Sequence, residues 1–209
     1  MLKKKEFLIT TVVAIICLVL IVIFPRDNVF QNFIVGISFF LIVPWLYIRI
    51  VLKESIADYG IQVGRVSSGV CWAIFSFVIF SLIILIASKY ANFVNGYRLP
   101  QMIDGNFGLF VVYEVFLVGF FLFLYELFFH GWLLNFLKKY VNGSAVITQF
   151  AVFVIFLALI DNLNWTFFPY MVINLFGGWV VYRSHSIWYS FIFGWIAIIL
   201  LDTLLLRVV

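Results

Sequence analysis

Long apolar runs alternate with short polar segments along almost the whole chain. An α-helix needs about 20 apolar residues to cross the hydrocarbon core of a bilayer. Most of the runs are close to this length, and the segments between them are too short to form domains of their own. The pattern therefore predicts seven membrane-spanning helices, at about residues 7–24, 30–52, 70–88, 109–137, 145–160, 168–182 and 186–206.

The fourth apolar run, residues 109–137, is longer than a single crossing requires. We expect it to tilt, to extend beyond the membrane or to break. Gly119 and Gly131 are its weakest points, because glycine lowers the stability of a helix. A break would raise the number of spans from seven to eight. Pro44 lies inside the second run and is expected to kink that helix.

Composition supports a membrane protein. The 209 residues are 66% hydrophobic and 11% charged, whereas soluble domains are nearer half apolar and a quarter charged. We expect an all-α, polytopic integral membrane protein with about seven or eight transmembrane helices around a polar intramembrane cavity. It forms a single membrane domain over residues 1–209, and residues 1–52 supply the first two helices. Basic residues are too sparse for a nucleic-acid surface, so the bilayer is the expected partner.

The distribution of basic residues predicts the orientation, because lysine and arginine are enriched in cytoplasmic loops. With a cytoplasmic N-terminus, nine basic residues lie at the inner ends of the predicted helices and four at the outer ends. We therefore expect a multi-pass protein of the cell membrane whose first apolar run is retained as a helix. The inner residues are Lys3, Lys4, Lys5, Arg49, Lys53, Arg65, Lys138, Lys139 and Arg183.

The segment 53–69 connects the second and third predicted helices. It is too short and too polar to span a membrane. We expect it to lie at the membrane surface, with Ile56, Tyr59 and Ile61 facing lipid.

An ionisable pair lies near the middle of the longest run, in the sequence FLFLYELFFHGWLL from Phe121 to Leu134. Glu126 and His130 are four residues apart, so they share one face of a helix and can touch. Ionisable side chains inside a bilayer are costly and usually mark a functional site. Such a pair can activate a water molecule or help to bind a metal. A hydrogen bond between helices is the simpler interpretation.

Other polar groups fall within or at the ends of the predicted helices, among them Asn174. Glu114 can be protonated or bonded to a neighbouring helix, and Asp161 can simply end the fifth helix. Asp202 can pair with Arg207 near the outer boundary. Intramembrane carboxylates also suit proton or cation pathways, so a small transporter or channel subunit is one candidate function.

The stretch YELFFHGWLL resembles the first signature of the CPBP family, the CAAX-protease and bacteriocin-processing intramembrane proteins. That signature reads Glu-Glu-x-x-x-Arg-Gly among apolar residues. Aligned in place, it puts Tyr125 at the first Glu and Glu126 at the second. His130 then takes the place of the Arg, and Gly131 that of the Gly.

Further stretches extend this resemblance to about residues 57–202. The segment ADYGIQVG, from Ala57, is similar to a short glycine-containing motif that many members carry early. The run FLALIDNL, from Phe156, resembles the second signature, Phe-x-x-x-His, with Leu157 at the Phe and Asp161 at the His. The stretch NLFGGWVVYRSHSIWYSFIFGW resembles the approach to the third signature. There, Gly194 and Ile198 hold the places of a His and of a polar residue.

The resemblance implies an intramembrane endopeptidase that uses Glu and His side chains to activate water and to stabilise the oxyanion. Of these polar signature residues, only the second Glu is retained, as Glu126. The remaining residues allow a rearranged site in which Glu126, His130 and Asp161 are catalytic. His130 would then be the base and Asp161 would orient it, with a divalent metal bound if the protein is active.

These departures favour a catalytically degenerate, pseudoenzyme-like member that acts by binding a partner protein, a peptide or a lipid. The alternative in the same family is an active intramembrane endopeptidase with atypical site residues. Whether the chain is an enzyme therefore depends on whether Glu126, His130 and Asp161 meet around a wet cavity.

Overall fold

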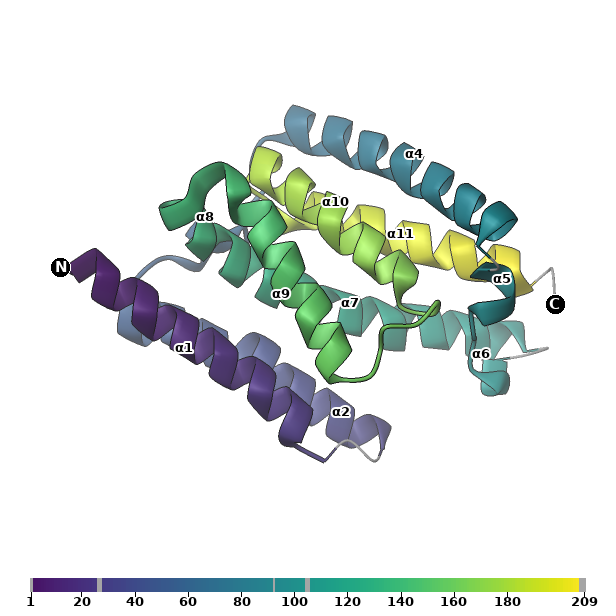
Figure 1. Ribbon diagram of the computed structural model, residues 1–209, viewed down its shortest axis with the longest axis horizontal. Helices are drawn as coiled ribbons and strands as arrows, with labels where there is room; N and C mark the ends of the chain where they lie inside the picture. Colours follow the sequence, from purple (N-terminus) through teal and green to yellow (C-terminus); the bar gives the residue numbers. More distant parts are fainter. Residues whose placement is uncertain (1, 26–27, 92, 104–105, 207–209) are drawn as a thin grey trace.

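The structure is a computed structural model that describes residues 2–25, 28–91, 93–103 and 106–206 (Figure 1). These residues form helices and connecting turns, and none of them lies in a strand. The principal α-helices are α1 (Leu2–Ile23), α4 (Val66–Tyr90), α9 (Ala145–Leu159), α10 (Phe168–Ser184) and α11 (Ile187–Leu206). The all-α fold predicted from the apolar runs is therefore confirmed.

Two further helices are continuous but contain wide π-helical turns, in which hydrogen bonds join residues i and i+5. The second helix runs through α2 (Val29–Gly36) and α3 (Val43–Leu46), each followed by π-helical turns. Those turns are Ile37–Ile42 and Tyr47–Leu52. Pro44 lies near the start of α3, so the expected irregularity is spread over the turns on either side of it.

The long central helix runs unbroken from Phe107 to Val141. It consists of α6 (Phe107–Val112), α7 (Gly119–Tyr125) and α8 (Asn135–Val141), joined by π-helical turns at Tyr113–Val118 and Glu126–Leu134. The structure shows that this run is one continuous helix. It does not break at the glycines: one π-helical turn ends just before Gly119, and the other contains Gly131.

The remaining elements are short. They are α5 (Phe93–Gly96) and three single 3₁₀ turns, Ile56–Tyr59, Gln101–Ile103 and Asn142–Ser144. The last of these reverses the chain between α8 and α9. Its first residue, Asn142, has a positive φ of 42°.

Five helical stretches among the described residues are long and apolar enough to cross a membrane: Lys5–Ile23, Val29–Leu52, Val66–Tyr90, Phe107–Leu159 and Ile187–Leu206. The fourth stretch includes the reversal before α9. α9 has 15 residues and α10 has 17, fewer than the about 20 that a perpendicular crossing needs. The polytopic membrane fold is therefore supported, whereas seven or eight complete crossings stays a prediction.

The helices run between two ends of the molecule. At one end, the N–H of Arg65 donates to the carbonyl of Ser184 at 2.8 Å, and Lys138 donates to the carbonyl of Tyr182 at 3.2 Å. We call this the Arg65 end. At the other end, the N–H of Arg98 donates to Oγ1 of Thr166 at 3.2 Å. The chain thus returns to the Arg65 end after α3, after α8 and after α10, as the predicted antiparallel layout requires.

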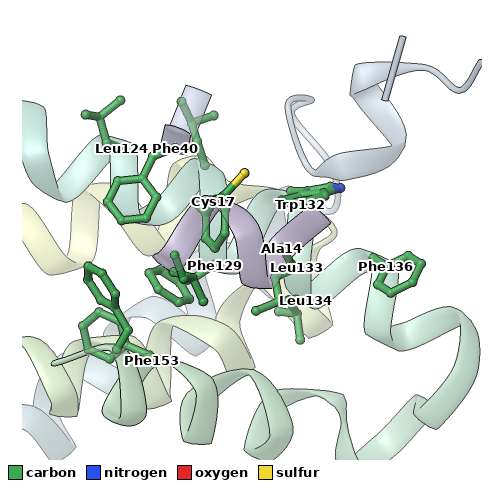
Figure 2. Packing of buried hydrophobic residues seen from close by; sticks show 14 of the residues in the cluster. Ala14, Cys17, Phe40, Leu124, Phe129, Trp132, Leu133, Leu134, Phe136 and Phe153 are labelled. Atoms are coloured by element: carbon green, nitrogen blue, oxygen red, sulfur yellow. The ribbon is translucent and has the colours of Figure 1, made fainter. Parts of the chain in front are cut away.

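Aromatic rings fill the core between the N-terminal helices and the central helix. Phe40 lies 6.0 Å from Phe129, and Phe129 lies 5.0 Å from Phe153, measured between ring centroids. Figure 2 shows these rings together with Ala14 and Cys17 of α1. A second apolar cluster joins α4, α10 and α11. The two clusters meet at the central helix, which positions the polar groups described below.

One expectation for the connecting segment 53–69 is wrong. Tyr59 was expected to face lipid, but it is 2% exposed. Its hydroxyl donates to the carboxylate of Glu54 and accepts from Lys139 at 3.2 Å. A tyrosine with two polar partners inside the protein is held there by its hydroxyl. Ile61 does remain 38% exposed.

Candidate functional site

The π-helical turns of the central helix carry the predicted ionisable pair. All nine residues from Glu126 to Leu134 are buried. Nδ1 of His130 lies 2.7 Å from Oε2 of Glu126. The i, i+4 spacing therefore brings the two side chains into contact, as the sequence predicts.

Hydrogen-bond geometry defines how many protons this pair holds. Nε2 of His130 lies 2.9 Å from the backbone oxygen of Asn174. A carbonyl oxygen only accepts, so Nε2 must carry a hydrogen. One further hydrogen lies between Nδ1 and Glu126, which makes the pair either imidazolium–carboxylate or imidazole–carboxylic acid. Both forms have no net charge, which lowers the cost of burying the pair.

Two other helices, α9 and α11, add hydrogen bonds, so that the pair and Asn174 become part of a buried polar network. The hydroxyl of Ser190 in α11 donates to Oε1 of Glu126 at 2.9 Å. Gln149 in α9 donates to Oδ1 of Asn174 at 2.9 Å. The four helical segments around the pair are therefore tied together through buried polar groups.

Sequence reasoning named Asn174 but missed Gln149 and Ser190. Gln149 is the one amide side chain in the apolar helix α9, so the sequence could have indicated that it belongs to a buried polar site. The indication for Ser190 is weaker, because serine is common at helix contacts within membranes.

Two adjacent glycines in the third turn of α10 allow this close approach. A Cβ at Gly177 would lie 2.3 Å from Oγ of Ser190 and 3.0 Å from Cε1 of His130. A Cβ at Gly178 would lie 3.1 Å from Oε1 of Gln149. The pair of small residues therefore brings the backbone of α10 against the polar network, as small residues do at membrane helix contacts.

The space beside Glu126 is small. A cavity of about 10 Å³ touches Glu126, with Tyr125 and Asn174 among its other lining residues. A water molecule needs about 10–15 Å³ of such space. The carboxyl group therefore has room for a single water at most, and a peptide has no room to reach it.

A larger cavity of about 250 Å³ shares Tyr125 and Tyr170 with the small one. It lies between the N-terminal helices, the central helix, α9 and α10. Polar atoms reach its wall mainly from three tyrosines and two asparagines, and its described lining includes no carboxylate, imidazole or thiol. The lining residues are Ile21, Asn32, Val35, Gly36, Phe40, Tyr113, Leu117, Val118, Phe121, Tyr125, Phe156, Ile160, Asn162, Phe167 and Tyr170.

Asp161 is not brought to the pair. It is exposed just beyond the end of α9, with a positive φ of 56°. Its N–H donates to the carbonyl of Ala158 at 3.2 Å, so it ends the helix in the manner of a left-handed cap. Ile160 lines the larger cavity together with Phe156, four residues earlier. The residue aligned with the imidazole of the second signature, Asp161, is therefore exposed, and the neighbouring cavity wall carries the apolar Ile160 instead.

The third signature also lacks a reactive group. A Cβ at Gly194 would lie 2.7 Å from Cγ2 of Ile173, and Ile198 is fully buried. This part of α11 is packed against its neighbours and offers no side chain for chemistry.

Two further carboxyl groups form a separate cluster near Tyr97, the residue that follows α5. Asp202 accepts from the hydroxyl of Tyr97 at 2.6 Å. Glu114 is 2% exposed, and its neighbour in the cluster is Asp202. Neither carboxyl oxygen of Glu114 has a hydrogen-bond partner among the described residues. The predicted partner Arg207 lies outside the described residues.

The side chains around Glu126 and His130 do not fit a site for a divalent metal. A catalytic zinc site uses three protein ligands. Within the part of the chain that the structure describes, no group of three or more His, Cys, Asp or Glu side chains lies close enough to hold an ion. Glu126 and His130 are two such donors, and each already bonds to other protein groups.

Comparison with known proteins agrees with the resemblance drawn from the sequence. Residues 105–197 match the family model described as type II CAAX prenyl endopeptidase Rce1-like. The match includes Glu126, His130, Gln149, Asn174 and Ser190, and therefore the whole polar network. Searches of curated proteins and of solved structures found no match.

Proposed function

We propose that this chain, an intramembrane-protease-like membrane protein of the CPBP family, is catalytically degenerate and acts by binding. Its binding site is the 250 Å³ cavity, and its ligand is a membrane-embedded segment of a partner protein or a lipid. The proposal includes the orientation predicted from the charges, in a cell membrane with a cytoplasmic N-terminus.

The main support for this proposal is that Glu126 and His130 do not line the 250 Å³ cavity. Peptide hydrolysis needs a base or metal that activates water next to the scissile bond, and donors for the oxyanion. Glu126 and His130 use their ring nitrogens and carboxyl oxygens to bond each other, Ser190 and Asn174. The cavity that could admit a ligand is lined instead by apolar groups, tyrosines and asparagines.

The shape and lining of that cavity support binding. Pockets for ligands are mostly apolar, with a few polar groups that set orientation. Tyr113, Tyr125 and Tyr170 supply such groups on one side, and Asn32 and Asn162 supply amides. A ligand with a long apolar part and a small number of hydrogen-bonding groups matches this wall.

A photo-crosslinking residue placed at Leu117 tests the proposal in membranes. Leu117 lines the cavity, whereas its neighbour Phe116 is 67% exposed and is not part of the lining. We expect Leu117 to give a discrete crosslinked product, an intact protein or a lipid, that Phe116 does not give. Identical products from both positions would contradict a role for the cavity, and recovery of a cleaved peptide would favour the active endopeptidase.

A further inference from the structure

A groove separate from the 250 Å³ cavity lies between α4 and α11. Its volume is about 470 Å³. The surface of its walls is wholly apolar, and the lining residues are Val70, Ala73, Ile74, Phe77, Tyr189, Ile192, Phe193 and Ile196. Ile74 is 61% exposed and Ile192 is 50% exposed, so the groove opens outward along the helices. A groove of this kind on a membrane protein suits a hydrocarbon chain.

Close packing defines where the groove begins. A Cβ at Gly69 would lie 2.3 Å from the ring of Tyr189, so α4 and α11 touch there. The groove starts one residue later on α4, at Val70, and extends away from the Arg65 end. Arg65 precedes Val70 by five residues, which is about 7.5 Å along a helix axis.

The Arg65 end carries cations without carboxylate partners. Among the described residues, ion pairs join Glu126 to His130 and Glu54 to Lys139. Arg65, Lys138 and Arg183 take part in neither. Nζ of Lys138 lies 3.5 Å from Nδ1 of His185, which puts two basic side chains side by side.

The basic side chains at this end lie close enough together to influence one another. Partial burial, and then the positive charges of Lys138 and Arg65, hold the pKa of His185 below its ordinary value. Cations that repel one another in this way attract an external anion. Arg183 stacks on Trp72 and Trp179, with its guanidinium carbon 5.4 and 4.9 Å from the ring centroids. A guanidinium over indole rings is a favourable cation–π contact, and tryptophan is enriched at the level of lipid headgroups.

We propose that the α4–α11 groove and the cations of the Arg65 end together bind an anionic glycerophospholipid. One acyl chain lies in the groove, and the phosphate contacts Arg65 with support from Lys138. The charge selects a lipid with net negative charge over a zwitterionic one. The expected cytoplasmic location of this end agrees, because anionic lipids are enriched in that leaflet. This site is separate from the 250 Å³ cavity and does not depend on the function proposed for it.

The direct test measures how added lipids raise the unfolding temperature of delipidated protein in detergent. The ligands are phosphatidylglycerol, phosphatidylcholine and diacylglycerol with the same acyl chains, together with glycerol phosphate. We expect phosphatidylglycerol to stabilise at the lowest concentration. Equal effects of phosphatidylglycerol and phosphatidylcholine, or of phosphatidylglycerol and diacylglycerol, would overturn selection by charge. If glycerol phosphate raised the unfolding temperature as much as phosphatidylglycerol does, the site would bind only a free anion, and the role of the groove would be overturned.

Matched variants locate the site. Arg65→Gln should weaken binding of phosphatidylglycerol about fivefold, since one basic side chain near a membrane surface contributes about 1 kcal/mol. Lys89→Gln, at the other end of the same helix, should leave binding unchanged. Ala73→Trp should fill the groove and reduce binding, whereas Val78→Trp, on an exposed face of α4 outside the groove, should not. If Arg65→Gln and Lys89→Gln weakened binding of phosphatidylglycerol equally, or if Ala73→Trp and Val78→Trp did, the proposed site would be contradicted. If Ala73→Trp does not fold, the comparison of Arg65→Gln with Lys89→Gln tests the proposal.

Discussion

His130 and Glu126 meet at 2.7 Å within a fully buried helical turn, with exposed fractions of 1% and 2%. Each also has a partner on another helix, the Asn174 carbonyl for His130 and the Ser190 hydroxyl for Glu126. The pair therefore joins three helices through a single proton-sharing contact. This arrangement gives both side chains a structural role that needs no substrate.

Substitutions of Glu126 distinguish that structural role from catalysis. Glu126→Gln keeps both contacts, because its amide can donate to Nδ1 of His130 and accept from Ser190. We expect it to change the free energy of unfolding by no more than about 1 kcal/mol. His130→Ala leaves a buried carboxyl group without its partner and should cost about 3–5 kcal/mol. The measurement is the thermal unfolding of purified protein in detergent, and a Glu126→Gln variant as unstable as His130→Ala would contradict this assignment.

Gly177 should tolerate no side chain. In Gly177→Ala the new methyl group would lie 2.3 Å from Ser190 Oγ, so Ser190 must turn away from Glu126 or α10 must move. Overpacking of this kind costs about 1–3 kcal/mol. Gly108→Ala is the control, because its nearest contact would be 3.4 Å away and alanine favours a helix. If both variants unfold at the same temperature, close packing at Gly177 is not what holds the network.

Tyr97 should stabilise the Glu114–Asp202 cluster. Tyr97→Phe removes the hydroxyl that donates to Asp202 at 2.6 Å and leaves a buried oxygen without a donor. We expect a loss of about 1–3 kcal/mol. Tyr90→Phe, at a position 73% exposed, should have no measurable effect. Equal unfolding temperatures for the two variants would show that this hydrogen bond contributes nothing to stability.

The contact between Glu54 and Lys139 predicts a pH dependence. Partial burial opposes ionisation of Glu54, but hydrogen bonds from Lys139 and Tyr59, and the ammonium charge, lower its pKa below the ordinary value. The folded state therefore gains stability above a pH of about 4.3 and loses that gain as the pH falls through the lowered pKa. An exposed pair of this kind contributes about 0.2–1 kcal/mol.

Unfolding temperatures of the wild type and of Glu54→Gln check this dependence. The wild type should be the more stable by a constant margin from neutral pH down to about pH 5, and the margin should shrink at lower pH. A margin that grows as the pH falls would have the wrong sign and would refute the assignment.

The apolar runs were sufficient to predict the helices, and the spacing of Glu126 and His130 was sufficient to predict their contact. Both features are local, because a helix places residues four apart on one face. The sequence also predicted that Asp161 could end its helix, which it does with a left-handed backbone.

The partners of the pair could not be predicted in the same way. Asn174 and Ser190 are 44 and 64 residues away from the groups they bond, and they meet the pair only because Gly177 allows α10 to approach. Tyr59 was predicted to face lipid together with Ile56 and Ile61. Its contacts with Glu54 and Lys139 depend on the fold and hold it inside the protein.

The central claim is that this intramembrane-protease-like protein binds but does not cleave. The most direct measurement incubates the purified protein, in detergent and in liposomes, with prenylated CAAX-type peptides and with bacteriocin-type leader peptides, and analyses the products by mass spectrometry. We predict that every peptide remains intact, with and without added divalent metal. Cleavage at a defined bond that Glu126→Ala and Glu126→Gln both abolish, while Glu126→Gln remains folded, would contradict the claim and make Glu126 a catalytic residue.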